Sequence, residues 1–181
     1  MLAQQGEFEN ALLRFNKALE IEEQALGSGH VNVAITNNIG EVYRQLGDNE
    51  KALFHYNTAL SIYILSLGDN HVNVADTYVN MGSVEDSLAI FQKALEYYHM
   101  VLEIYLKSYA GAHVTVAETE ENMAIVYEQM GELEKALGTF QKVLEKKCRM
   151  FGHFHVAVAD TYNNMGNVER KIRMMIGVTT H

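Results

Sequence analysis

The strongest constraint on the fold is a short segment that occurs four times, at intervals of 41 or 42 residues. Each copy starts with His, continues as Val-x-Val-Ala, and is followed by a stretch that contains Asn. The copies begin at His30, His71, His113 and His155. A fixed period of this length is typical of one supersecondary unit stacked on copies of itself. Such arrays contact only their neighbours and present a long concave surface, so the repeat predicts an architecture before it predicts a function.

Each repeat has the pattern of two helices joined by a short turn. In the unit that starts at His30, apolar residues recur at helical spacing until Gly47-Asp48 interrupts them, and a second helical run then ends at Gly68. The following units repeat this order. We therefore predict an all-α fold, a right-handed superhelical solenoid of antiparallel helix pairs. The predicted helices span residues 7–26, 31–46, 49–67, 72–87, 90–109, 114–130, 133–151 and 156–175.

The repeats predict a single array over residues 1–176, followed by a C-terminal tail at 177–181. Full helix pairs are expected at about 30–70, 71–112 and 113–154, with half-units at 1–29 and 155–176. Composition agrees, because 48% hydrophobic residues suffice for a core and the absence of Pro suits long helices. The net charge of -9 argues against a nucleic-acid surface, and a single Cys excludes internal disulfides.

Small and large side chains alternate at equivalent places in the predicted helices. This alternation is what a stacked helical core needs in order to interdigitate. The small residues of the second helices are Ala11, Ala52, Ala94 and Ala136, and those of the first helices are Gly40, Gly82, Ala124 and Gly166. The large residues of the second helices are Phe15, Tyr56, Tyr98 and Phe140, and Met81, Met123 and Met165 recur on the core face of the first helices.

At these residues the chain resembles the tetratricopeptide repeat family. Its 42-residue form is similar to the repeats of kinesin light chains and nephrocystin-like proteins. The matching motifs are GEVYRQLGDNEKAL at 40–53, VYEQMGELEKAL at 126–137, KALEI at 17–21, LGxxH at 67–71 and TYNNMG at 161–166. The resemblance covers nearly the whole chain and implies a scaffold for protein–protein interaction. It does not imply association with kinesin, because such repeats occur in unrelated assemblies.

The unit that starts at His71 departs most from the pattern. It carries Glu85 where the neighbouring units have Tyr43 and Tyr127, and Ala89 where they have a turn glycine. A lone buried carboxylate is costly, so we expect Glu85 either to turn to solvent or to find a partner. All units also lack the Pro that the family usually has after the His; Val31, Val72, Val114 and Val156 stand there.

Four asparagines spaced 42 residues apart are the leading candidates for partner binding. They are Asn38, Asn80, Asn122 and Asn164, each one residue before an inward Ile or Met. In related repeats the first helices line the concave groove, where an amide can both donate to and accept from the main chain of a bound peptide. The alternative is that these amides only bridge adjacent first helices.

Polar residues on either side of the asparagines extend this candidate surface. One turn towards the N-terminus lie Asp76, Glu118 and Asp160, and one turn the other way lies Glu41, with Gln45 and Gln129 further along. The acidic residues have a simpler interpretation, since carboxylates near a helix N-terminus favour the helix dipole. The surface has no cluster of Lys or Arg of the kind that clamps a carboxylate.

The sequence offers no convincing chemistry of other kinds. We expect no metal, because successive helices pack about 8–10 Å apart whereas zinc ligands lie about 2 Å from one ion. The repeated histidines are instead expected in loop or capping roles. Cys148 aligns with Ile64 and Leu106 and is expected to be a small buried hydrophobe. No catalytic arrangement or phosphate loop stands out, so we expect no enzyme and no cofactor.

Two functional hypotheses remain. The first is a scaffold that holds a peptide or helix along its concave face. The second is a structural, peripheral subunit of a large assembly that docks through its convex face and its ends, with the adaptor of a kinesin-type motor as a lesser alternative. Apolar side chains at the ends are expected to be contact surfaces, which would also allow self-association. These residues are Leu12, Phe15, Leu19, Val168, Ile172 and Met175.

We expect protein partners, no nucleic acid and no direct insertion into a membrane, because no apolar run approaches about 18 residues. The N-terminal MLAQQGEFE lacks the basic and apolar regions of a secretory signal. The expected location is intracellular, in the cytoplasm, and a processed N-terminus would also allow an organelle.

Overall fold

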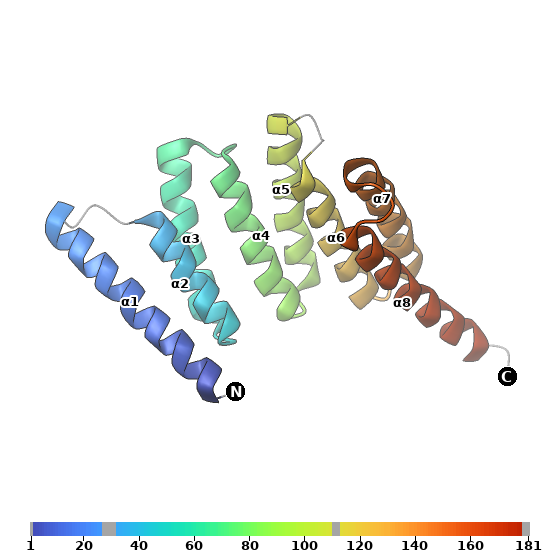
Figure 1. Ribbon diagram of the computed structural model, residues 1–181, viewed down its shortest axis with the longest axis horizontal. Helices are drawn as coiled ribbons and strands as arrows, with labels where there is room; N and C mark the ends of the chain where they lie inside the picture. Colours follow the sequence, from blue (N-terminus) through green and yellow to red (C-terminus); the bar gives the residue numbers. More distant parts are fainter. Residues whose placement is uncertain (1, 27–31, 110–112, 179–181) are drawn as a thin grey trace. The chain divides into compact units, whose positions relative to one another are not determined.

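The computed structural model describes residues 2–26, 32–109 and 113–178, and the helices in these ranges are drawn in Figure 1. They are α1 (Leu2–Leu26), α2 (Val33–Gln45), α3 (Asn49–Leu67), α4 (Val72–Ser87), α5 (Phe91–Tyr109), α6 (Val114–Gln129), α7 (Leu133–Phe151) and α8 (Val156–Val178). The described ranges contain no β-strand. The predicted all-α fold is therefore confirmed. The chain divides into two compact units, Met1–Ile90 and Phe91–His181, which we describe separately.

Most predicted helix bounds agree with the structure to within one residue, and three differ by two residues or more. The helix α1 begins at Leu2 rather than at residue 7, and α8 continues to Val178, into the predicted tail. The helix α2 begins at Val33, two residues later than predicted, because Asn32 is its N-cap and the Asn32 Oδ1 accepts a hydrogen bond from the Ile35 N–H at 3.3 Å. Residue 31, where this helix was expected to begin, lies outside the described residues.

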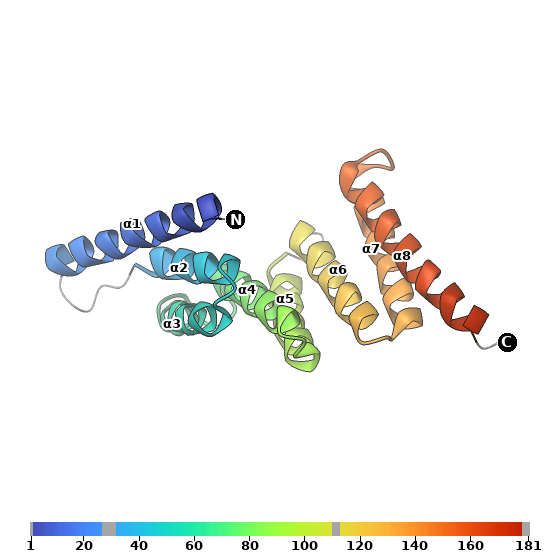
Figure 2. The same ribbon diagram turned by 90° about the horizontal axis from the view of Figure 1, so that it is seen from below.

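In the first unit, α2 packs against both α1 and α3, and α4 packs against α3 (Figure 2). The α2–α3 contact is close because a Cβ on Gly40 would lie 2.8 Å from the Tyr56 ring. Ala52, Tyr56 and Ala59 of α3 are completely buried in this contact region. The glycine in α2 therefore allows the large aromatic ring of α3 to lie directly on the helix backbone, as the small/large alternation predicts.

The second unit has its core between α5, α6, α7 and α8. Ala94 and Tyr98 of α5, Ala124 of α6 and Phe140 of α7 belong to one cluster of buried side chains. The completely buried Val168 of α8 joins the same cluster. The predicted alternation of Ala with a large aromatic residue thus forms the core of this unit.

Gly166 of α8 departs from this pattern. It is exposed, and a Cβ at this position would meet nothing within 4 Å. We expected close packing there, and that prediction is wrong for Gly166. The helix α8 is the last of the described helices, so no second helix follows it there to cover Gly166.

Three turns with the same hydrogen bonds end the helices α2, α4 and α6. Each has a residue with positive φ, and these residues are Gly47 (φ 78°), Ala89 (φ 57°) and Gly131 (φ 80°). In the turn after α4, the Ala89 N–H donates to the Asp86 carbonyl and the Ile90 N–H donates to the Glu85 carbonyl, both at 2.9 Å. This pair of bonds defines a Schellman motif, which normally places glycine at the left-handed position. Ala89 therefore adopts the turn of its neighbours at a steric cost.

The other departure in the unit of His71 has a different outcome. Glu85 is 1% exposed, so its side chain does not turn to solvent. Tyr127, at the equivalent place in α6, is also buried. The carboxylate of Glu85 therefore occupies an inward position of the repeat.

Candidate functional site

In the first unit, the neighbouring helices α2 and α4 carry two of the four repeated asparagines. Asn38 is exposed and Asn80 is half-buried, whereas the residues that follow them, Ile39 and Met81, are 1% exposed. The two helices contact each other. Both amides thus stand at the border between core and solvent, at equivalent positions of adjacent first helices.

In the second unit, α6 and α8 carry Asn122 and Asn164, which are both half-buried. The residue after Asn122 is the buried Met123. The Lys171 Nζ of α8 lies 2.8 Å from the Glu128 Oε1 of α6, so an ion pair connects these two first helices. The second unit therefore repeats the arrangement of the first, with two accessible amides on linked first helices.

The flanking polar residues differ in how accessible they are. Asp76, Glu118 and Asp160 are exposed, as are Gln45 and Gln129. Burial, followed by the charge of Asp76, raises the pKa of Tyr63 on α3, which places Asp76 within electrostatic reach of that helix. The exposed carboxylates give each unit an acidic edge beside its asparagines.

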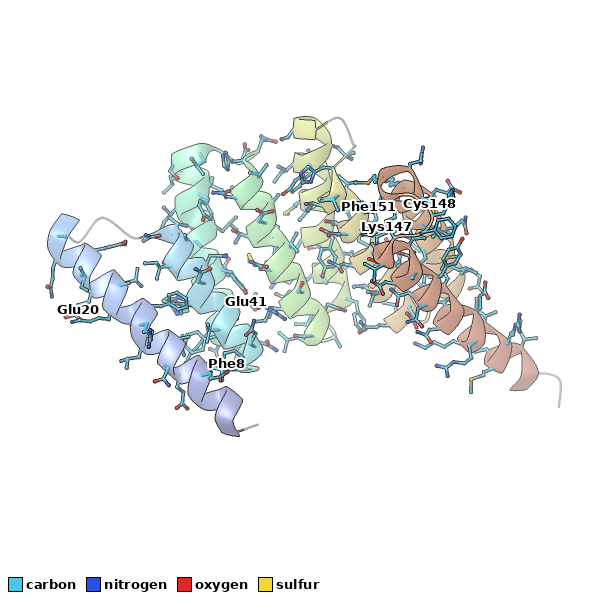
Figure 3. The ribbon with its side chains drawn as sticks, in the orientation of Figure 1. Phe8, Glu20, Glu41, Lys147, Cys148 and Phe151 are labelled. Atoms are coloured by element: carbon cyan, nitrogen blue, oxygen red, sulfur yellow. The ribbon has the colours of Figure 1, made fainter. Side chains whose placement is uncertain are left out.

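Glu41 is engaged inside the first unit, on the α2–α3 contact. The Tyr56 hydroxyl donates to its Oε2 at 3.0 Å, and Arg44 Nη2 and Gln45 Nε2 donate to its Oε1 at 2.6 and 2.7 Å. The hydrogen bond from Arg44 lowers the pKa of Glu41. Burial raises the pKa of Tyr56, which keeps the hydroxyl protonated as a donor. Figure 3 shows Glu41 on α2, beside α3. Its carboxylate holds the helix pair together and is only partly available to a partner.

A buried charge network joins α6, α7 and α8 in the second unit. The Lys147 Nζ donates to the Glu121 Oε2 at 2.6 Å, to the Thr161 Oγ1 at 3.1 Å and to the Ala157 carbonyl at 3.3 Å. The Thr161 Oγ1 lies 2.9 Å from the Glu121 Oε1, so the hydroxyl can donate to the same carboxylate. Lys147 lies among the side chains where α7 meets α8 (Figure 3). The network fixes the helix α8 to the α6–α7 pair.

The network was not predicted, although the sequence carries a signal for it. Position 147 is equivalent to Tyr63 and Tyr105, so the period places a lysine where α3 and α5 have an aromatic residue. A second missed pattern is a threonine in every first helix. These threonines are buried and lie 41 or 42 residues apart, at Thr36, Thr77, Thr119 and Thr161. The hydroxyls of Thr36 and Thr77 donate to the carbonyl four residues earlier, whereas the Thr161 Oγ1 lies 3.0 Å from the equivalent Ala157 carbonyl, which competes with Glu121 for its single proton.

The repeated histidines act as helix N-caps, as predicted. The Nδ1 atoms of His71, His113 and His155 each accept a hydrogen bond from the backbone N–H two residues later, at 3.2 to 3.3 Å. His30 lies outside the described residues. Among the residues that the structure does describe, no group of three or more His, Cys, Asp or Glu could hold a metal ion.

The end residues are less uniform than predicted. Leu12, Phe15 and Leu19 of α1 are half-buried, and the large apolar residues that are exposed among the described side chains of this helix are Leu13 and Ile21. In α8, Met175 is exposed as expected, but Val168 is completely buried and Ile172 packs partly against the core. Val168 is therefore not an end surface, because it faces α6 and α7 rather than the open side of α8.

Cys148 is half-buried and lines a hollow of about 440 Å³ between α7 and α8. Ile64 and Leu106, which stand at the equivalent positions, are 37% and 50% exposed. The prediction that these positions are buried inward positions is therefore wrong, because all three side chains are accessible to solvent in part or to a large degree.

Comparison with known proteins agrees with this geometry. The model of the tetratricopeptide repeat matches residues 1–63, 32–107, 91–149 and 115–173, which together span most of the chain. This chain belongs to the tetratricopeptide repeat family. A tetratricopeptide repeat array is a scaffold for protein–protein interaction, and the fold is generally non-catalytic. A search of curated proteins finds no match.

Solved structures with the same fold include kinesin light chain-like proteins. BtubC (BKLC) from P. vanneervenii matches with a TM-score of 0.75 and 19% identity, over 93% of this chain and 67% of that one. The putative kinesin light chain of Podospora anserina, with nearly identical TPR-like repeats, matches with a TM-score of 0.76 and 15% identity, over 98% and 84%. A variant of that protein gives a TM-score of 0.77 at 15% identity, over the same shares of the two chains. At these identities the likeness concerns the fold alone.

The described helices of this tetratricopeptide repeat protein include none that is long and apolar enough to cross a membrane. Protein partners follow from the family. The accessible asparagines are the candidate surface for binding these partners.

Proposed function

We propose that this tetratricopeptide repeat protein binds an extended peptide or a helix of a partner protein along its first helices, with the repeated asparagines as main-chain contacts. The observation that carries the proposal is the amide at one equivalent position of α2, α4, α6 and α8, accessible in every case. A structural role alone would not need solvent access at all of these positions. Asparagine offers both a donor and an acceptor, which suits a ligand gripped by its backbone.

The charges beside the asparagines define the class of partner. The exposed Asp76, Glu118 and Asp160 lie next to the amides, and the chain carries a net charge of -9. Opposite charges across an interface speed association and exclude partners of like charge. We therefore expect a neutral or basic peptide, with affinity that declines as salt is added.

The experiment is selection of peptides from a displayed random library on the immobilised full chain, followed by affinity measurement of one selected peptide by fluorescence anisotropy. The double substitution Asn80→Ala with Asn122→Ala should weaken binding about tenfold or more, because each lost hydrogen bond is worth about 1 kcal/mol. Asn57→Ala is the matched control, since Asn57 is an exposed asparagine on the second helix α3. If the double substitution leaves the affinity within about twofold while circular dichroism is unchanged, this surface is not the binding groove.

The second hypothesis, docking into a large assembly through the convex face and the ends, is supported by exposed apolar side chains outside the first helices. Phe54 and Leu65 on α3 are 67% and 87% exposed. The motor-adaptor role has no support beyond the shared fold and is not part of the proposal.

A further inference from the structure

We propose that one face of the helix α3 binds the same face of a second copy of this chain, so that the protein forms a two-fold symmetric dimer. The face consists of Phe54, Thr58, Ser61 and Leu65, which recur at helical spacing, and we call it the α3 stripe. Phe54 and Leu65 are 67% and 87% exposed. The stripe is separate from the proposed peptide groove, because the groove asparagines lie on the first helices α2, α4, α6 and α8.

The α3 stripe lies on the side of α3 that faces away from the core. The helix packs against α2 and α4, and its completely buried residues are Ala52, Tyr56 and Ala59. At 3.6 residues per turn, these three residues lie on the side of the helix opposite to the stripe. In Figure 2, α2 lies between α1 and α3, so the stripe faces away from both of these helices.

The segment that carries the stripe has no charged residue, which distinguishes α3 from the other second helices. Residues 52–67 contain no Asp, Glu, Lys or Arg. The equivalent segments are 11–26 in α1, 94–109 in α5 and 136–151 in α7, and they contain five, three and five such residues. The periodic position of α3 therefore does not explain its uncharged character.

At the positions of Thr58, Ser61 and Leu65, each of the other second helices carries at least two charged residues. In α1 and α5 they form ion pairs at 2.8 Å, and these are Lys17 with Glu20 and Lys107 with Glu103. The equivalent residues of α7 are Lys142, Glu145 and Arg149. A partner that covered these helices would remove water from charges at a cost, whereas covering α3 would not.

The hydroxyl groups of the α3 stripe are already satisfied within the helix. The Thr58 Oγ1 donates to the Phe54 carbonyl at 2.9 Å, and the Ser61 Oγ donates to the Asn57 carbonyl at 2.9 Å. A hydroxyl donor that keeps its acceptor can lose its water without being left unpaired. The stripe can therefore be buried at little cost, although two of its four residues are polar.

The order of side-chain sizes in the stripe favours a second copy as the occupant. The large Phe54 and Leu65 stand at its ends, and the small Thr58 and Ser61 stand in the middle. The spacings are 4, 3 and 4 residues, so the order is the same in both chain directions. A two-fold axis between Thr58 and Ser61 therefore places Phe54 of each copy against Leu65 of the other. This self-match is what a two-fold interface requires, and small residues at its centre let the helix axes approach closely.

The charge of the chain favours the same occupant. Two copies that each carry a net charge of -9 repel one another, so they can make close contact only through a surface without charge. The α3 stripe is such a surface. An anionic lipid surface or a nucleic acid would instead require Lys or Arg in the segment 52–67, which has neither.

The size of the stripe predicts a weak dimer. From Phe54 to Leu65 the helix rises by about 17 Å. A contact of one such helix with another is smaller than the area of about 800 Å² per partner that stable complexes bury. We therefore expect a reversible dimer with a Kd on the order of 10–100 µM.

The test is sedimentation of the full chain from about 5 to about 500 µM, compared with two single variants. Leu65→Lys places a charge on the stripe. Leu13→Lys is the matched control, because Leu13 is 69% exposed and stands at the position of Phe54 on α1, outside the stripe. Both side chains are largely exposed, so the helix content measured by circular dichroism should be unchanged.

The unmodified chain and Leu13→Lys should reach the mass of a dimer and no more, whereas Leu65→Lys should associate at least about tenfold more weakly. These masses are read without a peptide, so they do not depend on the proposed groove. An unmodified chain that stays monomeric would overturn the proposal, because a different molecule would then cover the stripe. So would masses beyond the dimer, or an equal loss of association in Leu13→Lys.

Two double variants test the two-fold arrangement. Phe54→Lys with Leu65→Glu brings opposite charges together at both ends of the stripe. Phe54→Lys with Leu65→Lys brings lysine against lysine, although it makes the chain as a whole less negative. The first variant should therefore associate about tenfold more tightly than the second. Equal association of the two, or tighter association of the second, would overturn the proposed contact of Phe54 with Leu65.

Discussion

The helix pairs α2–α3 and α6–α7 have the same place in the repeat but different chemistry at their contact. In α2–α3 the Tyr56 hydroxyl donates to the Glu41 carboxylate, and Arg44 binds the other side of that carboxylate. In α6–α7 the equivalent residues are Phe140 and Ile125, which pack in the apolar core of the second unit. Donor and acceptor are therefore lost together. The repeat fixes where two side chains meet, whereas the pair of residues decides whether the contact is polar.

The ion pairs of α6–α7 are the converse case, because here both charged partners are present in α6–α7 and both are absent from α2–α3. Lys146 binds Glu120 and Lys147 binds Glu121, across the helix pair. The equivalent residues of α2–α3 are Thr36 and Asn37 on one helix and Ile62 and Tyr63 on the other. The polar links of the two pairs, one in α2–α3 and two in α6–α7, thus lie at different heights along the helices. The two units should therefore lose stability on substitution at different positions of the repeat.

The largest effect is expected from Lys147→Ala in the second unit. Its side chain is 5% exposed and that of Glu121 is 16% exposed, so the substitution leaves a carboxylate largely buried without its cation. Removing one partner of such a pair costs about 3 kcal/mol. The free energy of unfolding, from urea denaturation followed by circular dichroism, gives the measurement.

Two further variants isolate the buried charge. Replacing both partners, with Lys147→Met and Glu121→Leu, should restore most of the stability because no charge remains buried. Lys146→Ala breaks a pair with side chains 32% and 22% exposed and should cost less than about 1 kcal/mol. Equal losses for Lys146→Ala and Lys147→Ala would show that burial does not distinguish the two links.

The next largest effect contrasts one repeat position in two environments. Gly40→Ala places a Cβ 2.8 Å from the Tyr56 ring and should cost about 2 kcal/mol of unfolding free energy by overpacking. Gly166→Ala meets nothing within 4 Å and should gain up to about 1 kcal/mol from helix propensity. The thermal midpoints of the two variants should therefore shift in opposite directions. A shift of the same sign would mean that the ring of Tyr56 moves aside without cost.

The turn after α4 offers a smaller gain. Ala89→Gly relieves a non-glycine residue held at φ 57°, where its neighbours Gly47 and Gly131 have φ 78° and 80°. The left-handed conformation costs about 1–2 kcal/mol for a residue with a Cβ, and glycine loses part of that gain through the entropy of the unfolded chain. We expect a net stabilisation of about 0.5–1 kcal/mol in urea denaturation. Gly131→Ala should produce the converse loss, and stabilities that do not move would mean that both turns tolerate a Cβ.

The periodic features of this fold were accessible from the sequence. The starts of α3, α4, α6, α7 and α8 coincide with the predicted ones, because His caps, turn glycines and N-cap residues recur with the period. The buried aromatic residues of the second helices were found for the same reason. Comparison with its copies therefore places a residue that repeats wherever the neighbouring helices repeat as well, and it fails at Gly166, which is exposed.

Residues that break the period were harder to place. The start of α2 was predicted two residues early because Asn32 replaces a histidine as the N-cap. The partner of Lys147 could not be found from one position, since it depends on a carboxylate 26 residues away. The burial of Val168 required knowledge of which face of α8 meets α7. The proposed groove remains a prediction, because accessible asparagines indicate a surface but not its ligand.

A modest effect is expected from Tyr56→Phe, which gives α3 the ring that α7 carries. The Glu41 carboxylate loses one donor but keeps Arg44 and Gln45, so the cost should be about 1 kcal/mol. Adding Glu41→Ile reproduces the α6–α7 combination. If the two positions are coupled as the comparison indicates, the double variant should be more stable than the sum of the single changes by about 0.5–1 kcal/mol. Strict additivity in urea denaturation would contradict the coupling.

The smallest effect is a pH dependence that belongs to α2–α3 alone. His55 stacks on Tyr43 at 5.5 Å, and burial lowers its pKa from the ordinary 6.5, whereas Thr139 at the equivalent place in α7 does not titrate. As the pH falls, His55 therefore takes up a proton near pH 6.5 in the unfolded chain, but only at a lower pH in the folded chain. The stabilisation is complete above pH 6.5 and is lost as the pH falls towards the lower, folded pKa.

His55→Gln removes this titration and keeps a good helix former. Between about pH 7 and pH 5, the unmodified protein should lose a few tenths of a kcal/mol more than the variant does, since one pKa unit corresponds to about 1.4 kcal/mol and the group is only half-buried. The remaining histidines are common to both proteins, so the difference between the two stability curves reports His55. Parallel curves over this range would show that the stacked imidazole takes up its proton as readily in the folded chain as in the unfolded one.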